Sequence, residues 1–148
     1  MESKIRHQYD ALLALQPVGT AAVTADGSSV NAVDIYRIAN GRGDVAGRYG
    51  IGSFDIVFYF KAATTGGATP ETYTINVVTT DAADANPVVQ ETFTVESNMI
   101  GDPYVLAFHP ASLKLKDADA AKVKLTIDVA GTAPSLDFYA FVAPHSHQ

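Results

Sequence analysis

The feature that most constrains the fold is a series of short segments in which apolar and polar residues alternate. Residues 72–80, TYTINVVTT, place Tyr73, Ile75 and Val77 on one side of an extended chain and polar residues on the other. A period of two is typical of a β-strand with one buried face, because successive side chains point to opposite sides. Similar segments, separated by turns rich in Gly, Pro, Asp and Asn, predict an all-β sandwich or barrel of about eight strands. The segments are 21–25, 29–38, 53–62, 72–80, 87–97, 104–110, 122–131 and 136–144.

In residues 87–97 the same alternation assigns Val89, Glu91, Phe93 and Val95 to one face and Gln90, Thr92 and Thr94 to the other. Helical spacing is scarce. It occurs at Ile5, Tyr9, Leu12 and Leu13 before Pro17, and residues 112–123 have the composition of a helical turn.

The length of 148 residues favours one domain. We expect an N-terminal arm (1–20), a β-sandwich domain (21–144) and a flexible tail (145–148). The apolar stretch after Asp10 is too short for a signal sequence or a membrane span, which predicts a soluble protein that keeps its N-terminus.

Two segments are apolar on both faces. Phe54, Ile56, Phe58 and Phe60 share one face of residues 54–60, and Val57 and Tyr59 lie on the other; residues 138–143 are similar. A solvent-facing antiparallel strand is polar at alternate positions, so we expect both segments to be covered on both sides. The cover is either the N-terminal segment or a long loop, or another subunit or partner. The candidate oligomer or arm-packing face consists of Val57, Tyr59, Tyr139 and Phe141.

Charge and composition exclude several classes of function. Ten Lys and Arg residues face sixteen acidic residues, with a net charge of −6, so the chain lacks the basic surface that nucleic-acid binding requires. It contains no cysteine, which excludes disulfides, zinc–thiolate and iron–sulfur sites. Charged residues make up 18%, against about 25% in typical soluble domains. A weakly charged surface suits a protein that a partner covers.

The segment NGRGDVAGRYGIG (40–52) contains five glycines, but it does not match a known phosphate-binding loop. It lacks the lysine and hydroxyl of a P-loop, and it leads into a predicted strand where a dinucleotide-binding loop requires a helix. The RGD tripeptide within it carries little weight by itself.

No residues form a recognisable catalytic or metal-binding constellation. His145 and His147 have the spacing of a metal pair, but they follow Pro144 at the end of the chain, where we expect a solvated tail. No serine lies in a GxSxG motif, and Asp55, Glu91 and Asp128 have the positions of ordinary strand acids. We therefore expect no enzymatic activity, no cofactor and no metal.

Taken in order, four segments resemble the small jelly-roll cement (decoration) proteins of tailed bacteriophages. The segments are YDALLALQPVGTAAVTADGSSVNAVDI (9–35), GRGDVAGRYGIGSFDIVFYF (41–60), YTINVVTTDAADANPVVQETFTV (73–95) and KVKLTIDVAGTAPSLDFYAFVAP (122–144). The glycine loop is longer than in that family, and PASLKLKDADAAK (110–122) replaces a shorter connection.

The resemblance implies an antiparallel jelly-roll and a virion protein, made in the bacterial cytoplasm, on the outer surface of an icosahedral head. Its expected partners are the major capsid protein and other copies of itself, as a symmetric dimer or trimer, with no nucleic acid and no membrane. Within the glycine loop we hypothesise that Arg42, Asp44, Arg48 and Tyr49 contact the capsid protein or a neighbouring copy, since arginine and tyrosine are favoured interface anchors.

Two other functions fit the same residues. A carbohydrate-binding β-sandwich for host attachment would use exposed tyrosines, although tryptophan, the strongest stacking residue for sugars, is absent. The candidate tyrosines are Tyr36, Tyr49, Tyr59, Tyr104 and Tyr139. A metal-dependent barrel enzyme is the third alternative, and stoichiometric metal after chelation and dialysis would favour it.

The loop hypothesis predicts the behaviour of a double variant. Replacing Arg42 and Arg48 by alanine removes both proposed anchors, so binding to phage heads is expected to weaken at least about tenfold. Co-sedimentation with purified heads measures the change. Unaltered binding would show that the loop does not contact the capsid.

Overall fold

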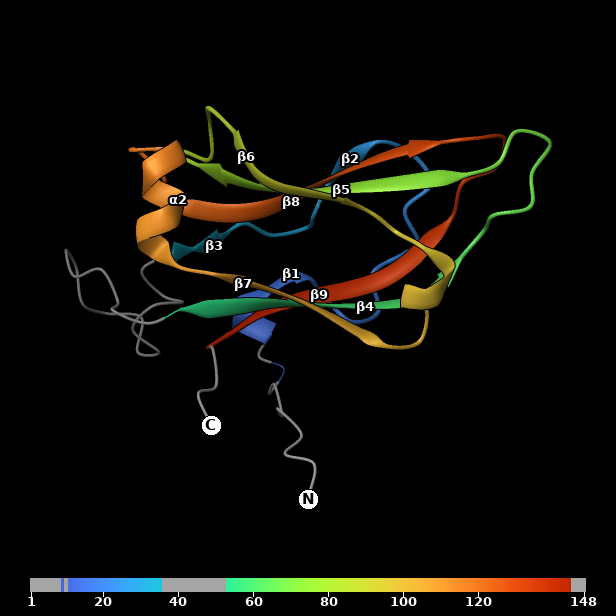
Figure 1. Cartoon of the computed structure of the whole chain (residues 1–148), viewed down its shortest axis with the longest axis horizontal. Coiled ribbons are helices and arrows are strands. Elements are labelled where there is room, and N and C mark those ends of the chain that lie inside the picture. The colour runs from blue at the N-terminus through green and yellow to red at the C-terminus, as the bar shows by residue number, and fades with distance from the viewer. Residues whose placement is uncertain (1–8, 10, 36–52, 145–148) are drawn as a thin grey trace, which may run out of the picture.

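The computed structural model describes residues 9, 11–35 and 53–144, which form a sandwich of two antiparallel sheets (Figure 1). The first sheet has the strand order β1-β9-β4-β7, and the second has the order β2-β8-β5-β6, with β3 also pairing with β8. The predicted all-β sandwich is confirmed. The strands are β1 (Ala14–Gln16), β2 (Gly27–Ser28), β3 (Val33–Asp34), β4 (Phe54–Ala63), β5 (Thr72–Thr80), β6 (Val88–Thr94), β7 (Pro103–Phe108), β8 (Lys122–Ala130) and β9 (Leu136–Pro144).

The path of the chain between the sheets is that of a jelly-roll. The chain alternates between the sheets at nearly every step, and only the β2–β3 and β5–β6 connections stay within one sheet. The short strands β2 and β3 both pair with β8, through Gly27 opposite Ile127 and Val33 opposite Val123. They therefore act as one interrupted edge strand. Nine strands appear where about eight were predicted because this edge is divided in two, while β1 takes the place of the predicted segment 21–25, which forms no strand.

The last six strands match their predicted segments closely, and the N-terminal part differs. Residues 21–25 contribute only an isolated bridge from Val23 to Leu136. Where helical spacing was noted before Pro17, a 3-10 helix, η1 (Ala11–Leu13), leads into β1. Leu15 of β1 is fully buried in the core, so the segment expected to be an arm supplies a strand of the first sheet. Residues 145–148 lie outside the described residues.

Two short helices connect β6, β7 and β8. The 3-10 helix η2 (Ser97–Met99) joins β6 to β7, and α2 (Pro110–Lys116) joins β7 to β8, in agreement with the helical turn expected nearby. His109 caps the start of α2, where its Nδ1 accepts a hydrogen bond from the Ala111 N–H at 3.1 Å, and Pro110 occupies the first turn. Proline is favoured there because the first N–H groups of a helix have no partner within it.

The core lies between the sheets and contains the predicted inner faces of β4 and β5. Phe54, Phe58 and Phe60 of β4 and Tyr73 and Ile75 of β5 are all at most 1% exposed. Full burial of each large apolar side chain contributes about 1.5–3 kcal/mol, so these faces supply much of the stability.

The assignment of faces in β6 is wrong at two positions. Phe93 packs against the core as expected, but Val89 is 51% exposed and Gln90 is buried. A register shift between Val77 and Val78 of β5 sets Glu91 opposite Val77 and Val89 opposite Val78, so Gln90 is an extra residue in β6. Such a β-bulge re-aims the side chains beside it, and a simple period-two pattern cannot show it.

At one end of the sandwich, Glu71 joins the loop before β5 to the turn after β8. Its carboxylate accepts hydrogen bonds from the Gly67 N–H at 2.9 Å and the Ala133 N–H at 3.3 Å. The bond from Gly67 is the main cause that lowers the pKa of this carboxyl below its ordinary value. Gly131 lies against Glu71 with φ of +108°, and a Cβ added there would lie 2.6 Å from the Glu71 Cα.

This contact predicts that Gly131→Ala is destabilising. Alanine disfavours the positive φ and has no room beside the backbone of Glu71, so the free energy of unfolding is expected to fall by at least about 2 kcal/mol. Gly66→Ala is the matched control, because nothing lies within 4 Å of its Cβ, and a change within about 0.5 kcal/mol is expected. Chemical denaturation measures both. Equal stability of the two variants would contradict the close approach.

Candidate functional site

The four residues of the predicted oligomer or arm-packing face lie together on the outside of the first sheet. Val57 pairs in register with Phe141, and Tyr59 pairs with Tyr139, on the adjacent strands β4 and β9. The rings of Tyr59 and Tyr139 stack with centroids 5.2 Å apart, and those of Tyr139 and Phe141 stack at 6.4 Å. We call these four residues the outer aromatic face.

Part of this face is covered within the chain. Val57 and Phe141 are each only 5% exposed, although they point away from the core, and they cluster with Ala14 and Ala143. Tyr9, from the segment expected to be the arm, sets its ring edge-on to Phe141 at 5.3 Å and to Tyr139 at 6.3 Å. The Tyr9 hydroxyl accepts a hydrogen bond from the Val18 N–H at 3.3 Å, which ties the ring to the residues after β1.

The apolar surface continues onto the edge strand β7. Val105 lies opposite Val57 in register and is 40% exposed, and Pro103 lies opposite the half-buried Tyr59. Next to them Ala107 is also exposed. A contiguous apolar surface of this kind on a folded protein marks an interaction site more often than scattered apolar residues do.

Charges lie at the border of this surface. Lys61 and Asp137 form an ion pair at 3.8 Å beyond Tyr59 and Tyr139, and both side chains are at least 40% exposed. At the opposite end, Asp55 is buried between Ala107 and Ala143 in register. Burial, and then the neighbouring hydroxyls of Tyr59 and Tyr9, raise the pKa of Tyr139. The Tyr139 hydroxyl is therefore uncharged at physiological pH.

The tyrosines do not present a single flat platform. Cross-strand pairing stacks Tyr59 against Tyr139, so each ring covers one flat side of the other. Tyr104 lies elsewhere and packs against Phe93 at 4.8 Å and Phe58 at 6.2 Å. Tyr36 and Tyr49 are outside the described residues.

Several other predicted positions also lie outside the described residues: Arg42, Asp44, Arg48 and Tyr49 of the glycine loop, and His145 and His147.

Among the strand acids, Asp128 accepts a hydrogen bond from Asn76 at 3.0 Å, and Glu91 is exposed. Within the described part of the chain, no group of three or more His, Asp and Glu residues is placed to hold a metal ion. No helix in that part is long and apolar enough to span a membrane.

Sequence reasoning missed the contribution of β7 and of Tyr9. The signal in β7 was readable, since Pro103, Val105 and Ala107 alternate with Tyr104, Leu106 and Phe108 and make both faces of the strand apolar. The contact of Tyr9 with this face could not be predicted from the sequence, because it depends on the path of the chain into β1.

Comparison with known proteins finds no matching family model, no matching curated protein and no matching solved structure.

The contact of Tyr9 with the outer aromatic face predicts two effects of Tyr9→Ala. Loss of two edge-to-face ring contacts is expected to cost about 0.5–1.5 kcal/mol of unfolding free energy. The raised pKa of Tyr139 is expected to fall toward its ordinary value, because the variant exposes the Tyr139 ring and removes a neighbouring hydroxyl. NMR titration of labelled tyrosine measures the pKa.

Tyr9→Phe is the matched control for this variant. It keeps the ring and removes only the hydroxyl, so it is expected to retain most of the stability. If Tyr9→Ala changed neither the stability nor the pKa of Tyr139, Tyr9 would not cover this face in solution.

Proposed function

We propose that this protein is a non-enzymatic structural protein of a bacteriophage virion. It binds, as a capsid cement or decoration protein, to the outer surface of the assembled lattice of major capsid protein. There it stabilises the head against the internal pressure of the packaged DNA. The protein is made in the cytoplasm of the host bacterium and acts as a symmetric homo-oligomer, a dimer or a trimer.

The resemblance of four sequence segments to jelly-roll cement proteins supports this proposal, and the jelly-roll connectivity is consistent with it. A fold alone does not identify a function, because the same architecture carries many unrelated ones. A surface suited to binding a partner is therefore needed as well.

The observation that carries the proposal is the apolar outer surface of the first sheet. The exposed residues of β7 and the half-buried Tyr59 and Tyr139 form an apolar surface across β7, β4 and β9, with the Lys61–Asp137 ion pair at one border. Val57 and Phe141 contribute little to it, because each is only 5% exposed. Burial of apolar area drives most protein–protein association, and aromatic residues are enriched at its centres. This surface suits contact with another protein.

Charge supports a protein partner over DNA. The described residues include 13 acidic residues and five lysines. Such a surface repels the phosphate backbone and offers little for nucleic-acid binding.

The physical basis of cementing is differential binding. A protein that binds the assembled lattice and not the free subunits shifts the equilibrium toward the lattice by mass action, by about 2.7 kcal/mol when its concentration is a hundred times its Kd. A symmetric oligomer presents the same surface more than once and matches the symmetry axes of a capsid.

A carbohydrate-binding module for host attachment is the alternative, and the ring geometry does not favour it. Sugar rings stack on exposed flat aromatic faces, whereas Tyr59 and Tyr139 stack on one another, so that one flat side of each ring is covered.

Co-sedimentation tests the proposed function. Purified protein is mixed with mature, DNA-filled heads and, separately, with free capsid subunits. We expect saturable binding to heads alone. Absence of binding to either would overturn the proposal, and a glycan array would then test the alternative.

A pair of variants tests the surface in the same assay. Val105→Glu places a charge in the exposed apolar surface, and burying it without a partner is expected to weaken binding to heads at least about tenfold. Val89→Glu is the matched control, because Val89 is a similarly exposed valine on β6, the edge strand of the other sheet. Equal binding by both variants would show that this surface is not the contact.

A further inference from the structure

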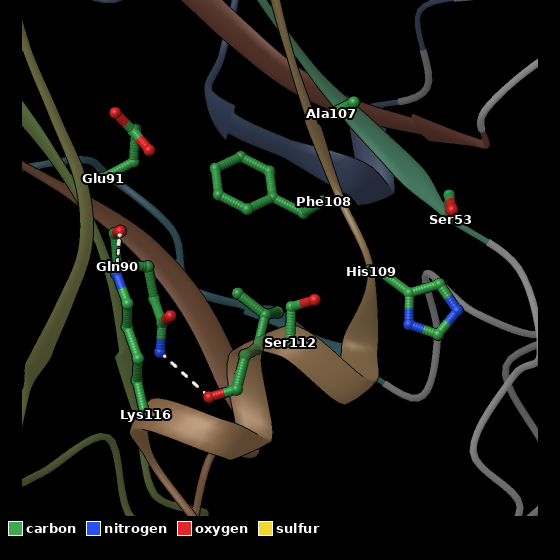
Figure 2. Close-up of a pocket in the computed structure, with 9 residues that line it drawn as sticks. Ser53, Gln90, Glu91, Ala107, Phe108, His109, Ser112 and Lys116 are labelled. Atoms are coloured by element: carbon green, nitrogen blue, oxygen red, sulfur yellow. Dashed lines mark hydrogen bonds between the residues drawn. The ribbon is translucent and has the colours of Figure 1, made fainter.

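A pocket of about 430 Å³ opens on the side of the sandwich where the edge strands β6 and β7 face one another (Figure 2). The helix α2 closes one end of the pocket. Gln90 and Glu91 of β6, Phe108 of β7, and Leu113 and Lys116 of α2 line it. It lies between the sheets, apart from the four residues of the outer aromatic face, and it borders the apolar surface of β7 at Ala107.

The pocket contains a fixed hydrogen-bond acceptor. Gln90 is 7% exposed, and its Nε2 donates to the Thr79 hydroxyl at 3.0 Å and to the Leu113 carbonyl at 3.1 Å. These two bonds orient the amide, and no described residue donates to its Oε1. No buried side-chain oxygen or nitrogen of the described residues lacks a partner, so this oxygen is accessible from the pocket.

The β-bulge in β6 brings a carboxylate to the same place. Because Glu91 lies opposite the buried Val77 in register, its side chain starts from the inner side of the sheet, at the open edge. Glu91 is exposed and forms no ion pair with any described residue. The bulge thus places two successive acceptors, Gln90 and Glu91, on the pocket.

An aromatic ring forms the opposite wall. Phe108 is half-buried and stacks on Phe54 with centroids 5.7 Å apart and planes 23° apart, which holds its ring in place. In Figure 2 Phe108 lies across the hollow from Gln90 and Glu91.

The lysine of the pocket is held at the strand edge. Lys116 Nζ donates to the Gln90 carbonyl at 2.9 Å, which uses one of the three N–H donors of its ammonium. An anionic ligand would face the Glu91 carboxylate and the Gln90 Oε1, both of which only accept hydrogen bonds.

We propose that this pocket binds the side chain of an arginine on a protein partner. The guanidinium group carries five N–H donors and no acceptor, which matches the Glu91 carboxylate and the Gln90 Oε1. Its plane stacks on aromatic rings, as Phe108 allows. The excess of acidic residues in the described part of the chain adds long-range attraction for a basic partner.

The pocket accepts such a side chain whatever protein carries it. A failure of the head-binding experiment therefore leaves this site untouched, and a failure here leaves the proposed capsid contact untouched.

The test uses NMR titration of the whole labelled protein with arginine capped as N-acetyl and N-methylamide. We expect saturable shifts at Gln90, Phe108 and their neighbours, including the Gln90 side-chain amide, with a Kd on the order of 1 mM. Capped citrulline has nearly the same shape without the charge, and it is expected to bind at least about tenfold more weakly.

Two variants distinguish binding in the pocket from attraction to the overall negative charge of the protein. Glu91→Gln is expected to weaken binding of capped arginine about threefold, because the Glu91 carboxylate is exposed and screened. Glu96→Gln removes an exposed carboxylate beyond the end of β6 and is expected to leave the Kd unchanged.

Three results would overturn the proposal. They are no saturation at roughly ten times the expected Kd, equal binding of capped arginine and capped citrulline, and stronger shifts of the same amides with capped glutamate. An equal effect of Glu91→Gln and Glu96→Gln would also overturn it, because the attraction would then come from overall charge.

Discussion

The pairing of β4 with β9 is the contact on which the rest of the structure depends. It extends from Phe54 opposite Pro144 to Ala63 opposite Leu136. Its register places Phe58 and Phe60 in the core and Val57 and Tyr59 outside. Because side chains alternate with a period of two, a slip of one residue would exchange these sets. The register of this one strand pair therefore decides which side chains enter the core and which form the outer aromatic face.

The open edges of the two sheets follow from the same topology. Each of the two open sheets has two edge strands, and β6 and β7 are the edges on the side where the pocket opens. Free edges promote association with other chains, and proteins cover or charge them. On β6 the helix α2 lies against the edge, where Lys116 binds the Gln90 carbonyl. The pocket is the space that remains beside this cover.

Much of the fold was predictable because most strands are long and strongly patterned. Residues 72–80 alternate regularly, and their predicted bounds agree with β5. The strand β1 was missed because three residues are too few to show a period, and Leu15 enters the core only by pairing of β1 with β9. Gln90 was assigned to the wrong face because a bulge is a relation between two strands, and β6 alone does not show it. For the candidate site, Val57, Tyr59, Tyr139 and Phe141 were predicted, with the N-terminal segment as one candidate cover. Their pairing in register and the role of Tyr9 within that segment were not predicted.

The sequence by itself determined the fold class, the strands that need cover on both faces, and the acidity that disfavours nucleic acid. These properties follow from local periodicity and composition. Only the tertiary structure decided which strands are neighbours, and so which side chains meet. Tyr59 and Tyr139 are 80 residues apart in the chain, and their rings stack with centroids 5.2 Å apart. Phe108 of one sheet and Gln90 of the other line the same pocket. The physical reason is that strand pairing joins distant segments through backbone hydrogen bonds whose register no single segment encodes.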